Sequence, residues 1–200
     1  GPRVAERVFV TRHIKEHMPE AFDFDIPSVC AIAPGVLGVT GVETMDIVFG
    51  VANKVKPDLI IAVDALASRR AARISTTIQL SDSGISPGSG VGNTRADLSR
   101  ANLGVPVIAV GVPLVVYAST ISQDTISLIA DETGLHGDEE RLRELAEQVI
   151  AKHMGDFIVT PKDIDVIVED MAGIIANAIN SALFGNNLLP IQSAFVNSAF

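Results

Sequence analysis

A short apolar run closed by an acid constrains the fold of this chain more than any other feature. Residues Leu59 to Val63 are apolar and partly β-branched, Pro57 precedes them, and Asp64 follows directly. A run of that length without polar alternation is typical of a strand buried on both faces of a parallel sheet. Asp64 would then lie at the carboxyl end of a central strand, where open α/β sheets bind their ligands. Burying a carboxylate there costs free energy unless it is hydrogen-bonded, paired with a charge or used in catalysis. A turn or helix-capping role explains Asp64 equally well.

Strand-like and helix-like segments alternate along the rest of the chain. Short β-branched runs predict strands, and apolar residues at helical spacing predict helices. Further strands are predicted at 29–33, 73–80 and 105–110, and helices at 2–17, 41–53, 95–101, 122–132, 138–153 and 160–184. This alternation is typical of an α/β fold, and we expect a layered, central, mostly parallel sheet with helices on both faces. Residues 1–184 are expected to form a single domain and residues 185–200 a C-terminal tail.

Charge and cysteine content exclude several classes of protein. The formal net charge is −9 and the pI is about 4.8, so we expect no direct binding of nucleic acid. The one cysteine, Cys30, cannot form an internal disulfide, and a reducing cytoplasm is the simplest compartment. Arg3, Glu6 and Arg7 interrupt any signal peptide. Residues 101–123 carry no charge, but their glycines and prolines favour a strand and a turn over a membrane span.

His13 and His17 lie in a segment that fits the H-x-x-E-H pattern of some zinc peptidases. Pro19 follows closely, so His17 falls in the last turn of its helix. The helix dipole favours histidine at that position without any metal. Because short motifs of this kind often match by chance, we predict no metal site here and no cofactor.

Residues 81–93 form a loop rich in glycine and serine. The glycine spacing does not fit a dinucleotide-binding fingerprint, and the loop contains no nucleophile elbow. It is either a long surface turn or a loop that brings backbone N–H groups close to a substrate carbonyl. Long loops held between elements of one sheet carry function more often than mere connection, which favours the second interpretation.

Five segments together resemble the germination protease family of spore-forming bacteria. They are residues 35–43, 58–67 with its Asp-Ala-Leu-Ala, 81–93, 104–113, and 159–171. The resemblance covers nearly all of residues 1–183, and the long Ser-Asp to Gly-Asn loop makes it specific. It implies a fold similar to that of the hydrogenase-maturation peptidases.

The resemblance also implies an activity. The family is expected to degrade small acid-soluble spore proteins during germination, in the cytoplasm of the spore core, as a self-cleaving zymogen and a homo-oligomer. It uses a pair of acidic residues, of which one matches Asp64. The other belongs to an Asp-x-Leu-Gly-Pro segment, of which residues 1–200 contain only the final Gly1-Pro2. Because the second acid is not among these residues, residues 1–200 alone are expected to be inactive. In such a pair one carboxylate activates water and the other, protonated, polarises the scissile carbonyl.

The expected site has one catalytic residue, Asp64, and a substrate-binding set. That set is Glu43, Ser81, Asp82, Gly84, Gly88, Ser89, Gly90, Gly92 and Asn93. Asp82 also fits an ordinary Ser-Asp-Ser-Gly turn, and Ser86 stands where the resemblance leads us to expect histidine. Two alternatives stay open: a metal-assisted peptidase of hydrogenase-maturation type with Asp64 as a ligand, and an inactive structural or oligomerising core.

Overall fold

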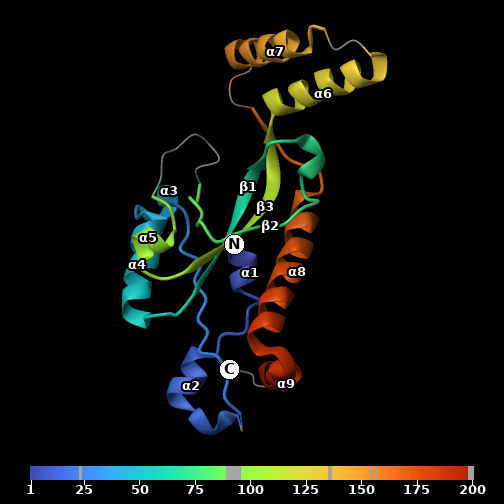
Figure 1. Cartoon of the computed structure of the whole chain (residues 1–200). Coiled ribbons are helices and arrows are strands. Elements are labelled where there is room, and N and C mark those ends of the chain that lie inside the picture. Colours follow the sequence, from blue (N-terminus) through green and yellow to red (C-terminus); the bar gives the residue numbers. More distant parts are fainter. Residues whose placement is uncertain (23, 89–95, 135–136, 154, 156, 198–200) are drawn as a thin grey trace. The chain divides into compact units, whose positions relative to one another are not determined.

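The computed structural model describes residues 1–22, 24–88, 96–134, 137–153, 155 and 157–197 (Figure 1). The chain forms two compact units, one made of Gly1–Thr44 with Asp165–Phe200 and the other of Met45–Ile164. We call the first the terminal unit and the second the sheet unit. The single domain predicted over residues 1–184 stays a prediction, because two compact units can fold together or separately.

The sheet unit contains one mixed sheet. Its strands are β1 (Ile60–Ser68), β2 (Gln79–Ser81), β3 (Val107–Tyr117) and β4 (Ile158–Val159), with β3 between β1 and β2 and also paired with β4. β1 is parallel to β3, whereas β2 and β4 are antiparallel to it. The α/β class is confirmed, but the mostly parallel sheet is wrong for the described strands. Residues 69–78 are too short a connection for a parallel crossover, so the chain returns from β1 as an antiparallel strand.

One face of this sheet is covered by α4 (Thr44–Val55) and α5 (Arg100–Leu103). Its buried cluster is Ala62, Leu98, Leu103 and Val107, with Met45, Val48, Ile60 and Ile85 packed around it. Burying a leucine or valine side chain contributes about 1.5–3 kcal/mol, so this small cluster anchors both helices. The layered arrangement with helices on both faces is not confirmed, because the cluster joins these helices to one face.

The start of α4 differs from the prediction. We expected Thr40 to cap a helix beginning at position 41, but Thr40 is the last residue of α3 (Leu37–Thr40). Its hydroxyl donates to the Val36 carbonyl at 3.2 Å and accepts from the Val42 N–H at 3.2 Å. A threonine hydroxyl that bonds within its own turn is not available to cap the next helix, so α4 begins at Thr44.

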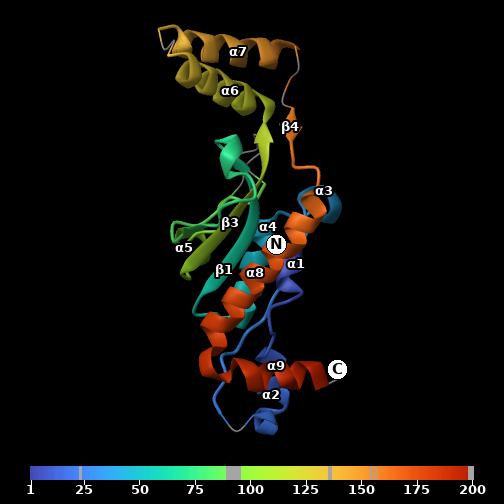
Figure 2. The same ribbon diagram turned by 90° about the vertical axis from the view of Figure 1, so that its right-hand side faces the viewer.

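β3 is longer than predicted and includes Pro113. Pro113 pairs with Leu66, and the register between β1 and β3 shifts directly after this pair. Such a shift accommodates a residue that has no N–H to donate. Beyond β3 the chain forms a hairpin of two helices, α6 (Ala118–Thr133) and α7 (Glu139–His153), which lies past the end of the strand (Figures 1 and 2). The uncharged residues 101–123 thus include the end of α5, all of β3 and the start of α6, which agrees with the expectation of a strand followed by another element instead of one continuous helix.

The terminal unit is mostly helical. Its elements are α1 (Pro2–Ala5), α2 (Arg12–His17), the short helix η1 (Pro19–Ala21), α3, α8 (Ile164–Phe184), η4 (Gly185–Asn187) and α9 (Leu188–Asn197). The single helix predicted at 2–17 is broken, because Thr11 is fully buried and bonded to the segment before Val29. Its hydroxyl donates to the Pro27 carbonyl at 2.5 Å, and the Thr11 N–H donates to the Val29 carbonyl at 2.9 Å. Residues 29–33 belong to no described strand, so that strand prediction is wrong.

Within the segment predicted to be a tail, residues 185–197 contribute to the core of the terminal unit. Ile191 of α9 is fully buried and packs with Ile26 and Phe184. Aromatic rings surround this cluster, with the centroids of Phe9 and Phe195 5.0 Å apart. By length and hydropathy alone the segment Ile164–Ser193 could cross a membrane; 22% of its most apolar stretch is buried, and Phe184 and Ile191 of this segment belong to the core.

Candidate functional site

Asp64 lies in the middle of β1 rather than at its carboxyl end. The strand continues through Ala65, Leu66 and Ala67 to Ser68, in pairing with β3. The expectation that Asp64 closes the strand is therefore wrong, because the small and apolar residues after it stay in the sheet. Asp64 is half-buried, and it presents its carboxylate from a face of the sheet instead of from an edge loop.

Alternation along β1 determines which face carries Asp64. Residues two apart in a strand share a face, so Asp64 lies on the side of Ile60 and Ala62. Both of these belong to the cluster under α4 and α5. The carboxylate therefore lies on the same face as this apolar core, next to residues that are shielded from water.

Gly111 is the residue of β3 that pairs with Asp64, and the side chain of Leu66 packs closely against it. A Cβ on Gly111 would overlap the Leu66 side chain, with Leu66 Cγ only 2.8 Å away. The Leu66 isobutyl group therefore lies over Gly111, directly beside Asp64. Sequence reasoning did not single out this pair, although a glycine inside the apolar run of β3 indicates close packing.

The loop that follows β2 starts on the same face. Ser81 pairs with Ala109, and Ala109 pairs with Ala62, so Ser81 points to the side of Asp64. The Ser81 and Ser83 hydroxyls are 2.6 Å apart, and the Ser83 N–H donates to Ser81 Oγ at 3.1 Å. Asp82 is exposed at the bend that these bonds form, which is the ordinary turn geometry expected of its sequence.

The base of this loop is fixed to the sheet unit. The Ile85 N–H donates to the Leu98 carbonyl at 3.1 Å, and the Leu98 N–H donates back to the Ile85 carbonyl at 2.7 Å. Gly84 has φ +95°, and a Cβ there would overlap the Leu98 carbonyl and approach the Ser99 Cβ to 2.9 Å. Only glycine fits both demands, whereas the predicted substrate-binding role of Gly84 stays a prediction.

The remaining predicted positions differ in what the structure says of them. Gly88 has φ +74° and is exposed, whereas Ser89, Gly90, Gly92 and Asn93 lie outside the described residues. Glu43 is half-buried before α4 in the terminal unit, and its grouping with Asp64 stays a prediction.

No metal centre is evident in the part of the chain that the structure describes. Within these ranges no three histidine, cysteine or acidic side chains come together. His13 and His17 are both exposed on α2, which is what the surface-helix interpretation predicts for them.

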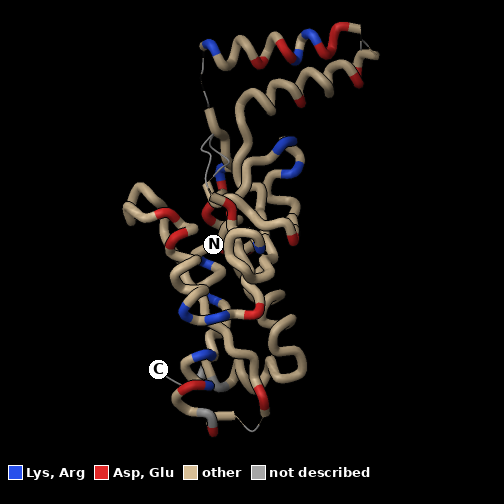
Figure 3. The backbone as a smooth tube through the Cα atoms, turned by 60° about the vertical axis from the view of Figure 1, so that its left-hand side comes forward, with Lys and Arg blue, Asp and Glu red and all other residues tan. Residues whose placement is uncertain are grey.

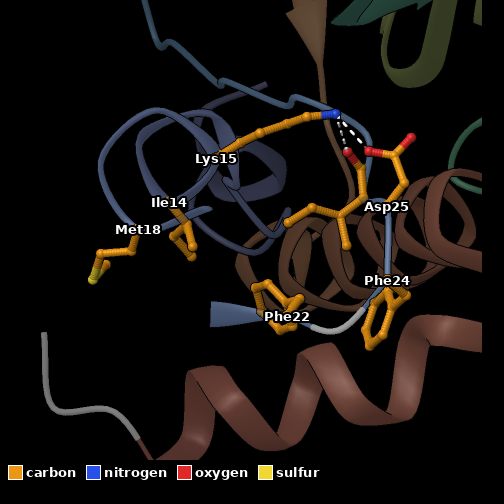
Figure 4. Close-up of a pocket in the computed structure, with 7 residues that line it drawn as sticks. Ile14, Lys15, Met18, Phe22, Phe24 and Asp25 are labelled. Carbon is orange, nitrogen blue, oxygen red and sulfur yellow. Dashed lines mark hydrogen bonds and ion pairs between the residues drawn. The ribbon is translucent and has the colours of Figure 1, made fainter. Parts of the chain in front are cut away.

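The terminal unit contains a pocket of about 210 Å³ with an apolar wall. Its lining residues are Ile14, Lys15, Met18, Phe22, Phe24, Asp25 and Ile26. The Lys15 ammonium donates to Asp25 Oδ1 at 2.8 Å and to the Ile26 carbonyl at 2.9 Å (Figure 4). This hydrogen bond and the lysine charge lower the pKa of Asp25 below its usual value. The pair neutralises itself, so we assign this pocket no catalytic role.

Comparison with known proteins finds a matching family. A model of the germination protease family matches residues 1–136 and 132–188. Relatives named germination protease include those of Caldanaerobacter subterraneus at 48% identity, Clostridium tetani at 45% and Bacillus cytotoxicus at 41%. Each alignment covers 92% of this chain and, in the same order, 60%, 61% and 62% of the relative. This chain thus spans about 60% of the length of those relatives.

Proposed function

The chain belongs to the germination protease family, and from that premise we propose that the protein is an endopeptidase that degrades small acid-soluble spore proteins during germination. The observation that carries the proposal is Asp64, a half-buried carboxylate on a sheet face. The base of the Ser81 loop is held on the same face by the Ile85–Leu98 bridge. An acid beside a fixed loop can place water and a substrate carbonyl together.

We propose that Asp64 works as one member of an acid pair. The second carboxyl comes from the Asp-x-Leu-Gly-Pro segment that the family resemblance implies. The ionised member takes a proton from water as the oxygen attacks the carbonyl carbon, and the protonated member donates a hydrogen bond to the carbonyl oxygen. The Leu66 side chain next to Asp64 excludes water from one side, which strengthens both interactions.

The test is an Asp64→Asn variant of the full-length protein, incubated with a purified small acid-soluble spore protein. Losing a general base costs about 10²–10⁴-fold, so we expect turnover to fall by at least that factor. Circular dichroism should show an unchanged fold, since asparagine is isosteric. Asp131→Asn is the matched control, because Asp131 is exposed on α6, lies outside the expected site and should keep most of the activity. Near-normal turnover by the Asp64 variant contradicts the assignment.

We further propose that the protein is made as a zymogen in the cytoplasm of the spore core, forms a homo-oligomer, and shares its fold with hydrogenase-maturation peptidases. The α6–α7 hairpin supports the oligomer, because apolar side chains on both helices are exposed. Charged residues of both signs lie along α7 (Figure 3). Its first turn is acidic at Glu139 and Glu140 and its last turn basic at Lys152 and His153, so two antiparallel copies of α7 would pair opposite charges.

A further inference from the structure

The face of the sheet that carries Asp64 also carries the polar side chain of Gln79, which has no role in the site so far. We propose that Gln79 is a positioning residue, whose side-chain amide holds a peptide group of the bound substrate beside the Asp64 carboxylate. The inference rests on the proposed peptidase function and adds a residue from a different strand to its site.

Strand pairing places Gln79 and Asp64 in one row across the sheet. Gly111 pairs with Asp64 on one side and with Gln79 on the other. Paired residues point their side chains to the same face, so the carboxylate and the amide emerge together. Two strand spacings separate their backbones, which is about 10 Å. A peptide that lies across β3 over this row can therefore contact both groups.

The middle of the row is apolar and has no side chain of its own. Gly111 contributes none, and Leu66 lies over it. The row therefore presents a carboxylate, an aliphatic surface and an amide in that order. Hydrogen bonds made over an aliphatic surface compete less with water than those on an open strand, which increases the effect of a correctly placed amide.

The chemistry of glutamine suits this task. A primary amide donates through its NH₂ group and accepts through its oxygen, so it complements a peptide group. Gln79 is exposed on β2, so its side-chain amide is accessible to a bound peptide. The neighbouring Leu80 is 72% exposed and points to the opposite face, so it offers a control on the same strand.

The experiment compares four variants of the full-length protein with a small acid-soluble spore protein as substrate. Gln79→Ala removes the amide, Gln79→Glu keeps its shape without the donor, and Gln79→Asn keeps the amide on a shorter stem. We expect the first two to lower kcat/KM about tenfold or more, mainly in kcat, and the third to recover part of the loss. Leu80→Ala should stay within about twofold of the wild type, and melting temperatures should be equal throughout.

Three outcomes overturn the inference. Gln79→Ala could retain wild-type kcat/KM, Gln79→Glu could be fully active, or Leu80→Ala could lose as much activity as Gln79→Ala. The last result assigns the loss to the edge strand and not to the amide. Asp64→Asn is measured in parallel: if that variant is inactive while the Gln79 variants are normal, the proposed function stands and this inference fails.

Discussion

At the scale of single residues, Gly111 connects packing to the site. In a Gly111→Ala variant the new Cβ must displace Leu66, whose Cγ would lie 2.8 Å away. Overpacking of this kind costs about 1–3 kcal/mol, and the displaced leucine moves within the row that holds Asp64. We therefore expect a lower free energy of unfolding and reduced peptidase activity, measured by urea denaturation and by substrate cleavage.

Gly50 is the matched control for this substitution. It lies inside α4, and a Cβ there meets nothing within 4 Å. Gly50→Ala should therefore stabilise the protein by about 0.5–1 kcal/mol, because alanine restricts the unfolded chain and suits a helix. A Leu66→Ala background should remove most of the cost of Gly111→Ala, since the overlapping atoms are then absent. An unchanged cost there contradicts the Leu66 contact.

At the scale of elements, Asn180 holds the N-terminal segment against α8. It is 3% exposed, its Nδ2 donates to the Arg7 carbonyl at 3.1 Å, and its Oδ1 accepts from the Phe9 N–H at 3.0 Å. Asn180→Ala leaves both backbone groups without their partner, so we expect a loss of about 1–3 kcal/mol in urea denaturation. Asn177→Ala, on an exposed position of the same helix, should change the free energy of unfolding by less than about 0.5 kcal/mol. Equal effects of the two variants refute this role.

At the scale of the whole molecule, the α6–α7 hairpin predicts self-association. Leu142, Leu145 and Val149 follow one face of α7 at helical spacing and are 49%, 53% and 47% exposed. Helices of this length are marginal in water unless an apolar face is covered. We expect a Leu142→Ser/Leu145→Ser variant of the full-length protein to form smaller oligomers, as measured by light scattering after gel filtration. Leu189→Ser, exposed on α9, is the control that should keep the wild-type mass.

Local patterns predicted the elements that depend on a residue's near neighbours. The apolar run that starts at Leu59 supplies the first part of β1, from Ile60, and α8 ends at Phe184, before Gly185, as its spacing indicates. The family resemblance also came from the sequence alone, because it rests on short motifs of consecutive residues. These features require no knowledge of which strand lies beside which.

Cross-strand relations were decided by the tertiary structure. The position of Asp64 inside β1, the antiparallel return of β2 and the alignment of Gln79 with Asp64 through Gly111 all depend on strand register. Residues 64, 79 and 111 are far apart along the chain, and a shift of one residue in any pairing would turn their side chains to the other face. No local period encodes such a register, because it is determined by the packing of Leu66 over Gly111 and of the apolar cluster under α4 and α5.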